Sequence, residues 1–444
     1  LMETGQTLTF NRDLNITDLL FNYGVRINYD LIRDINSSTI RLASGNVGNQ
    51  TQYQDFFWPY HPVITSKNDH PITKNIDPVN LRFGNTIDTL KNNISKTILL
   101  ESSNFSKPIG TPNIIALEDI SKKPVTTSKS PKELQNILGS LALPENGLPA
   151  GKLLSETSKL LIDHSLFNGH PKFFGFITSS AAPIGALADL LASSVNANVG
   201  GQILSPMATE IEKQTIRWLA EFIGVSPDYG GVLVSGGNMA NFTAFLAART
   251  AKAPKNIKEE GLSISKKQLI TYCSKSTHTW IDKAAVLFGH GTNSIRWIPT
   301  DASNKMDNRI LEQTIKDDLK NGHQPFLVVG TAGDVSTGVV DNLEAIAGIC
   351  KTHDLWFHID GAYGIPAAII PELKALFKGI KEADSIALDP HKWLYSPLEA
   401  GCTLVKNPKH LLDTYSSHPE YYNFSLTEEG GSLNYFEYGL QNSR

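Results

Sequence analysis

The order of hydrophobic and polar positions changes partway along the chain. From residue 135 onward, apolar residues recur at helical spacing, most clearly in the amphipathic segment 207–224. Short apolar runs follow, mostly separated by helical patterns: GVLVSGG at 231–237, then QLITYC, SIRWIP, PFLVVG, LWFHID, SIALD and CTLVK. Nearly all-apolar strands that alternate with helices predict an α/β fold with a mainly parallel, seven-stranded sheet covered by helices on both faces.

The first 120 residues have a different texture, because they are dense in Asn and Thr and poor in Ala and in long periodic helices. The polar stretch 121–134 contains two prolines, which is typical of a linker. We therefore predict a separate α/β N-terminal module at 1–120 and a linker at 121–134. A helical part at 135–225 and a large sheet domain at 226–444 complete the predicted organisation.

Composition narrows the class of partner. The formal net charge is −4 and no basic stripe is present, so we predict a small-molecule substrate and no nucleic acid. No apolar run approaches the roughly 18 residues that a membrane span needs. Three scattered cysteines, Cys273, Cys350 and Cys402, predict buried thiols in a reducing compartment, and hence a cytoplasmic protein.

Ligands of parallel sheets bind beyond the carboxyl ends of the strands, which directs attention to the residues after each run. The turn Gly236, Gly237, Asn238 follows a strand and opens a helix, so its backbone N–H groups suit a phosphate. The alternative is a plain tight turn in which Asn238 caps the helix.

Three further strand ends carry side chains that could bind a ligand or take part in catalysis. Asp360 ends LWFHID, where a buried carboxylate needs a cationic partner or a metal; a helix cap is the alternative. Lys392 follows SIALD and is a candidate Schiff-base former, or else a surface turn lysine. His278 offers a flat ring for stacking, or a structural hydrogen bond. We expect His358 to face away from Asp360 and predict no metal site, with zinc or iron as a minor alternative.

The combination is more informative than any single residue. A phosphate-binding turn, a buried aspartate and a strand-end lysine are the contacts that pyridoxal 5′-phosphate requires at its phosphate, its ring nitrogen and its aldehyde. The sequence therefore predicts this cofactor.

The motifs HIDGAYG (358–364) and DPHKWL (389–394) resemble the pyridoxal-phosphate-dependent group II decarboxylases, the family of aromatic-L-amino-acid, tyrosine and glutamate decarboxylases. Matching segments from 170 to 285 extend the resemblance over about residues 130–440. It implies the type I transferase fold of these enzymes and a homodimer. The family's small C-terminal domain is not found in this sequence, so we expect it to be missing.

The resemblance also implies roles for individual residues. Lys392 would form a Schiff base, Asp360 would pair with the ring nitrogen, and His278 and Ala362 would contact opposite faces of the ring. The phosphate contacts would be Gly236, Gly237, Asn238, Asp389 and His391. The substrate side would be lined by Phe176, Ile177, Thr178 and Ser179. Tyr421 would protonate the product carbon.

The implied reaction is decarboxylation of an L-amino acid, with a lean towards aromatic ones, to the amine and CO2 through a quinonoid intermediate. The alternatives are an aldehyde synthase, a glutamate- or cysteine-sulfinate-type decarboxylase, and an inactive truncated fusion that acts as a binding or scaffold protein. Residues 1–120 resemble a fragment of the auxiliary component of gliding-motility ABC transporters.

Overall fold

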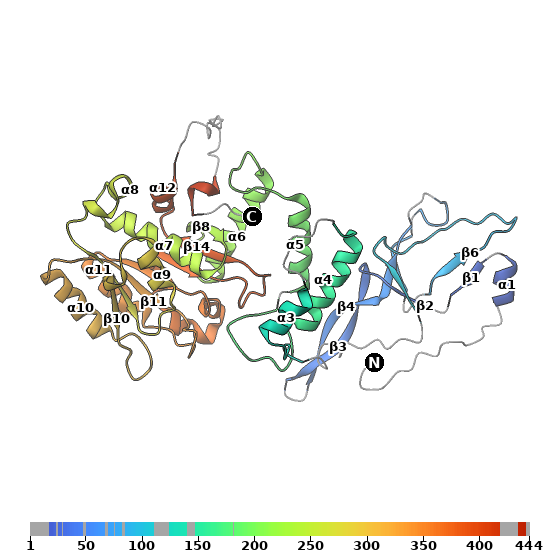
Figure 1. Cartoon of the computed structure of the whole chain (residues 1–444), viewed down its shortest axis with the longest axis horizontal. Coiled ribbons are helices and arrows are strands. Elements are labelled where there is room, and N and C mark those ends of the chain that lie inside the picture. Colours follow the sequence, from blue (N-terminus) through green and yellow to red (C-terminus); the bar gives the residue numbers. More distant parts are fainter. Residues whose placement is uncertain are drawn as a thin grey trace. The chain divides into compact units, whose positions relative to one another are not determined.

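The structure is a computed structural model that forms two compact units, residues 1–123 and 124–444, and each is described by itself (Figure 1). The described residues are 17–23, 25–28, 30–47, 50–66, 70–74, 76–81, 85–110, 124–139, 147–180, 182–417 and 434–440.

The described part of the first unit consists mainly of antiparallel strands. The helix α1 (Thr17–Asn22) precedes β1 (Val25–Ile27), which pairs with β6 (Ile87–Thr89). β2 (Asp30–Arg33) pairs with β7 (Lys107–Gly110). The long hairpin of β3 (Ser37–Val47) and β4 (Gln50–Ile64) carries β5 (Val79–Asn80) at its end. Few large side chains are buried here, Leu31 and Trp58 among them.

The second unit contains the predicted seven-stranded sheet, in the order β10-β9-β11-β12-β13-β14-β8. All neighbours pair in parallel except β14, which runs antiparallel to both β13 and β8. The strands are β8 (Gly230–Val234), β9 (Leu269–Ser274), β10 (Ile295–Ile298), β11 (Gln324–Thr331), β12 (Trp356–Asp360), β13 (Ser385–Leu388) and β14 (Gly401–Val405).

Helices cover both faces of this sheet, as predicted. Side chains from α6 (Pro206–Phe222), α10 (Asn308–Lys320) and α11 (Leu343–His353) contribute to one buried cluster. Side chains from α7 (Gly237–Lys252), α9 (Trp280–Leu287) and α12 (Lys409–Tyr415) contribute to the other. Neighbouring strand residues alternate between the clusters: Phe357 of β12 lies in the first and Trp356 in the second.

Three shorter helices precede α6 in the second unit. The first, α3 (Pro131–Leu138), begins with a capping box in which the Ser130 hydroxyl accepts from the Glu133 N–H and the Glu133 carboxylate accepts from the Ser130 N–H. The next two, α4 (Ala150–His164) and α5 (Pro183–Val195), contain no buried residue. Most of their leucines lie exposed in this single copy of the chain.

The three cysteines are buried free thiols, and burial raises the pKa of each. None of the described helices combines the length and the apolar character needed to cross a membrane. The cytoplasmic location stays a prediction.

A buried carboxylate joins two strands to a helix at the β10 edge of the sheet. Asp318 of α10 accepts a hydrogen bond from the Tyr272 hydroxyl at 2.8 Å and from Arg296 through two nitrogens, the shortest contact being 2.7 Å. Asp318 is 5% exposed, so both partners are needed to compensate its lost hydration.

We expect Asp318→Ala to lower the free energy of unfolding by about 3 kcal/mol, because it leaves the Tyr272 hydroxyl and the Arg296 charge without their acceptor. Urea denaturation followed by circular dichroism measures the effect. Asp317→Ala is the matched control, since Asp317 lies in an exposed ion pair with Lys320, and it should change stability by less than about 0.5 kcal/mol. Equal effects of the two substitutions would contradict the assigned role.

Candidate functional site

A cavity of about 410 Å³ lies at the carboxyl ends of the parallel strands. It is lined by the residues that follow β8, β9, β11, β12 and β13, the positions expected from the topology. Ten of the predicted site residues line it: Ile177, Gly236, Gly237, Asn238, His278, Asp360, Ala362, Asp389, His391 and Lys392.

Lys392 reaches this cavity from a turn after β13. Its backbone N–H donates to the Asp389 carbonyl at 3.0 Å, and its Nζ lies 2.9 Å from Asp389 Oδ2. The lysine side chain is 22% exposed and the aspartate side chain 2%. The alternative of a plain surface lysine is therefore wrong, because Nζ forms a largely buried ion pair inside the site.

Burial raises the pKa of Asp389 to about 6, and the positive charge of Lys392 acts in the opposite direction. The nearby Asp360 adds to the rise. Among the described residues, Asp389 Oδ1 has no hydrogen-bond partner. This carboxyl group therefore holds its charge against considerable desolvation.

Asp360 ends β12 and is held by two neutral donors. The Trp280 indole N–H donates to Oδ2 at 2.8 Å, and the Ala362 backbone N–H donates to Oδ1 at 3.2 Å. The expectation that Asp360 needs a cationic partner or a metal stays a prediction; within the chain, these two N–H groups supply its hydrogen bonds. Both bonds fix the position of this side chain at the cavity wall.

The expected orientation of His358 is also wrong. Side chains two residues apart on a strand lie on the same face, so His358 and Asp360 point the same way. The Trp280 ring contacts the His358 ring edge-on, with centroids 5.9 Å apart, while its N–H binds Asp360. His358 Nε2 lies 2.7 Å from Asn241 Oδ1 and Nδ1 lies 2.8 Å from Ser385 Oγ, which makes it a structural residue.

The glycine turn before α7 leaves no room for side chains. Gly236 has φ of 83°, in the left-handed region, and a Cβ added to it would lie 3.3 Å from the His391 ring. A Cβ on Gly237 would lie 2.6 Å from Asp389 Oδ2. Gly236 takes the N-cap position without a side-chain hydrogen bond, so Asn238 does not cap this helix. The turn therefore presents backbone N–H groups to the cavity.

His391 lies beside this turn. Its Nδ1 accepts the Ala400 backbone N–H at 2.9 Å, which places the proton of the neutral ring on Nε2, 3.7 Å from Asp389 Oδ2. Burial, and then the charge of Lys392, lower its pKa. His391 is consequently a neutral donor at neutral pH.

The predicted ring contacts come from separate strand ends. His278 follows β9, and its Nδ1 accepts the Trp280 backbone N–H at 3.3 Å. Ala362 follows β12, and both residues line the cavity.

Only part of segment 176–179, which was predicted to line the substrate side, lies at the cavity. Ile177 lines the cavity, whereas Phe176 is 80% exposed with φ of 60°. The Ser179 hydroxyl donates to the His391 carbonyl at 2.9 Å and so braces the loop of Lys392. Thr178 does not line the cavity. Tyr421 lies outside the described residues.

The structure adds residues that the sequence reasoning did not select. Trp280 follows His278 by two positions, and its indole N–H donates to Asp360. Two more polar residues that line the same cavity are Asn241 of α7 and Glu399, which lies two residues before β14. Neither directly follows a strand, so the strand-end rule does not select them.

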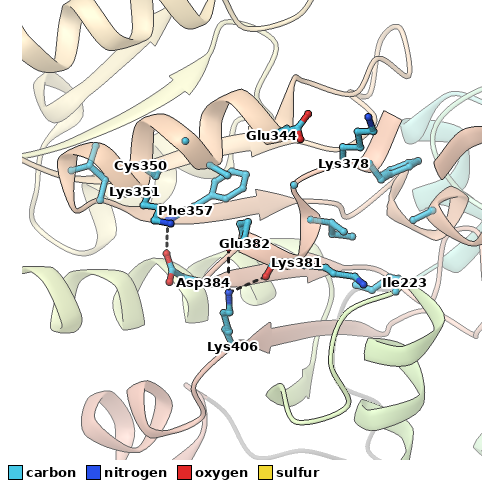
Figure 2. A pocket seen from close by; sticks show the side chains of 18 of the residues that line it. Ile223, Glu344, Cys350, Lys351, Phe357, Lys378, Lys381, Glu382, Asp384 and Lys406 are labelled. Atoms are coloured by element: carbon cyan, nitrogen blue, oxygen red, sulfur yellow. Dashed lines mark hydrogen bonds and ion pairs between the residues drawn. The ribbon is translucent and has the colours of Figure 1, made fainter. Parts of the chain in front are cut away.

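A larger cavity, of about 940 Å³, lies at the opposite, amino-terminal edge of the sheet (Figure 2). Its lysines include Lys406, whose Nζ donates to the Lys381 carbonyl at 2.9 Å and lies 3.8 Å from Glu382. Asp384 accepts from the Phe357 N–H at 2.8 Å. These groups tie loops together. Of the seven strands of this sheet, only the antiparallel β14 has its carboxyl end at this edge, so we place the functional site in the smaller cavity.

The part of the chain that the structure describes contains no group of three or more His, Cys, Asp or Glu residues arranged to hold a metal ion.

Known proteins resemble this chain in sequence and fold. It is 35% identical over 328 residues to the aromatic-L-amino-acid decarboxylase of Bacillus atrophaeus, which covers 74% of this chain and 66% of that protein. It is 33% identical to the acidic amino acid decarboxylase GADL1 of Homo sapiens, covering 69% and 58%. The structure of Oryza sativa TDC with PLP and tryptamine aligns with a TM-score of 0.68 at 27% identity, covering 72% and 67%.

The chain thus spans just under two thirds of the Bacillus atrophaeus protein's length. Its residues 1–138 match the family described as an ABC-type uncharacterized transport system, which confirms the resemblance of the N-terminal region. Residues 131–444, more than half of the chain, match the pyridoxal-dependent decarboxylase conserved domain. The chain therefore belongs to the pyridoxal-dependent decarboxylase family.

Proposed function

We propose that this protein binds pyridoxal 5′-phosphate and decarboxylates an L-amino acid to the amine and CO2. The observation that carries the proposal is the meeting of Lys392, Asp360 and the glycine turn of α7 around one cavity. Membership of the family supports it.

The residues present fit this cofactor. The turn at Gly236 and Gly237 excludes side chains and offers the amino end of a helix of 16 residues to the phosphate. Asp360, fixed by its two N–H donors, would hold a proton on the ring nitrogen, and Lys392 would supply the amine. When bound, the cofactor supplies an aldehyde that reacts with amines and a ring that accepts the electrons of the broken bond.

The protein's own groups prepare this chemistry. Lys392 must lose a proton before its amine can react, and Asp389 Oδ2, 2.9 Å from Nζ, orients that amine. His278 and Ala362 line the cavity from separate strand ends and would confine the ring between them. Asp360 adds fixed negative charge where the ring nitrogen needs its proton, which is electrostatic preorganisation.

We also propose that the substrate is an aromatic amino acid. Among the described residues, Lys392 is the only lysine that lines the cavity, and no arginine does, so a distal carboxylate would find little cationic support. The resemblance to an aromatic-L-amino-acid decarboxylase agrees with this choice. An acidic substrate, as the name of the GADL1 relative suggests for that protein, is the alternative.

The protein mixed with pyridoxal 5′-phosphate should develop an absorbance band at roughly 400–430 nm from the Schiff base, and Lys392→Ala should lose it. Lys275→Ala is the matched control, because Lys275 also follows a strand, β9, but is exposed and does not line the cavity. A band that persists in Lys392→Ala, or its absence in the parent protein, would refute the assignment.

Release of CO2 from a panel of L-amino acids tests the substrate class. We expect aromatic amino acids to exceed glutamate and cysteine sulfinate in kcat/KM by at least about tenfold, the ratio expected for one lost favourable contact of about 1.4 kcal/mol. Preference for an acidic substrate would support the alternative. Cofactor binding without CO2 release from any amino acid would favour a binding or scaffold protein.

Tyr421 offers a test of the protonation step. Tyr421→Phe should lower amine formation by about 10²-fold or more, the usual contribution of a positioned acid. Tyr422→Phe is the matched control. Aldehyde in place of amine from the parent protein would instead indicate an aldehyde synthase.

We also propose that the protein is a homodimer through α4 and α5. Leu154 of α4 and Leu190 and Leu191 of α5 are each about two-thirds exposed, which is unusual for neighbouring leucines in a lone chain. The start of α5 is tied to the lysine loop, since the Ala182 N–H donates to the Tyr395 carbonyl at 2.9 Å. An interface on α5 would therefore adjoin the cofactor cavity.

Light scattering after size exclusion should give twice the chain mass, and the double substitution Leu190→Glu, Leu191→Glu should shift the protein to monomer, because it places charge in the apolar contact. Lys320→Glu on α10 is a control for added negative charge outside α4 and α5, since Lys320 lies in an exposed ion pair with Asp317. A monomeric parent protein contradicts the proposal.

A further inference from the structure

The carboxylate of Asp389 occupies the position at the amino end of α7 where an anion would bind. A Cβ on Gly237, the first residue of this helix, would lie 2.6 Å from Oδ2 and 3.0 Å from Oδ1. No side chain could stand between the carboxylate and the helix. The helix end that is proposed to bind the cofactor's phosphate thus already faces a buried acid.

The other groups around Asp389 offer little compensation for a second anion. Lys392 Nζ is its one close cation among the described residues, at 2.9 Å. His391, on the same loop, is neutral because burial and Lys392 lower its pKa. Asp360 from β12 is acidic, and so is Glu399, whose Oε2 lies 3.5 Å from the Cβ position of Gly236. The first turn of α7 contributes only its backbone N–H groups.

We propose that Asp389 takes up a proton when a phosphate ester binds at the glycine turn, so that the turn binds anions most tightly when this carboxyl group is neutral. Two anions side by side in a buried site cannot both keep their charge, as in paired carboxylates that share one proton. In the step, an O–H bond forms on Asp389, and the proton comes from solvent. The neutral acid can then donate a hydrogen bond to the anion instead of repelling it.

The pKa of Asp389 makes this uptake accessible near neutrality. Burial raises the pKa of Asp389 to about 6 even with Lys392 beside it. A bound anion raises that pKa further, because it disfavours the charged carboxylate. Above about pH 6 each bound anion must therefore be accompanied by a proton, and affinity falls as pH rises.

This inference rests on the proposed function, and its test uses pyridoxine 5′-phosphate, a phosphate ester of the same ring without the aldehyde. Lys392 cannot react with this probe, so its affinity reports binding alone. Dissociation constants are measured between pH 5.5 and 8.5 for the parent protein and for Asp389→Asn. Glu344→Gln is the matched control, since Glu344 is an acid at the rim of the distant cavity (Figure 2).

We expect the ratio of the dissociation constants, parent over Asp389→Asn, to rise at least about tenfold between pH 6 and pH 8, as expected from linkage to one proton. Ionisation of the ester itself affects both proteins and cancels in the ratio. The parent and Glu344→Gln should give a constant ratio. Circular dichroism checks that Asp389→Asn is folded.

Infrared difference spectra of the parent protein give a second readout that needs no variant. Adding the probe at pH 7.5 should produce the carbonyl band of a protonated carboxylic acid. A constant ratio, or a spectrum without this band, overturns the inference alone. Failure of both the parent and Asp389→Asn to bind the probe at any pH overturns the proposed function together with the inference.

Discussion

The buried ion pair between Lys392 and Asp389 is the interaction on which the candidate site depends. At 2.9 Å it orients the lysine amine at the carboxyl ends of the strands, in a cavity whose other charged side chains are mostly acidic. Without the aspartate, a lysine with 22% side-chain exposure would lack its compensating charge. Without the lysine, Asp389 would be a buried acid beside Asp360 and would be protonated near neutral pH.

The backbone around this ion pair leaves no room for a side chain at Gly401. β14 begins at Gly401, where an added Cβ would lie 2.5 Å from the Gly236 backbone. The loop that carries Lys392 therefore returns to the sheet directly beside the glycine turn of α7. Because β14 runs antiparallel between β13 and β8, it connects the strand that precedes the lysine with the strand that precedes the turn. The position of the lysine relative to the turn is thereby set by the sheet.

The large sheet could be predicted from sequence because most of its strands are buried on both faces, so they appear as mainly apolar runs. Topology alone predicted the edge of the sheet that carries the site. This edge brings together Lys392, Asp360, His278 and the glycine turn. Hydrogen bonds between residues far apart in the sequence could not be predicted in this way. Trp280 looks like an ordinary helix residue, and only the fold brings its N–H to Asp360 across 80 positions.

The first unit illustrates the opposite case. Its β3 and β4 form a long hairpin, but polar residues occupy both faces of much of the strand 37–47, so no clear period of two stands out. Its ion pairs, such as that of Arg41 with Asp55, are exposed and contribute little stability. Such a unit leaves a weak sequence signal because little apolar surface is buried on folding.

The two edges of the large sheet show why cavity size alone does not locate chemistry. At the amino-terminal edge, the ion pairs of Lys252 with Asp354 and of Lys406 with Glu382 each contain an exposed acid, so water weakens both interactions. At the carboxyl-terminal edge, Asp360 and Asp389 are 6% and 2% exposed, and each depends on a specific donor or cation. Desolvation makes small changes in charge there energetically large, and this is the condition that proton transfer and anion binding require.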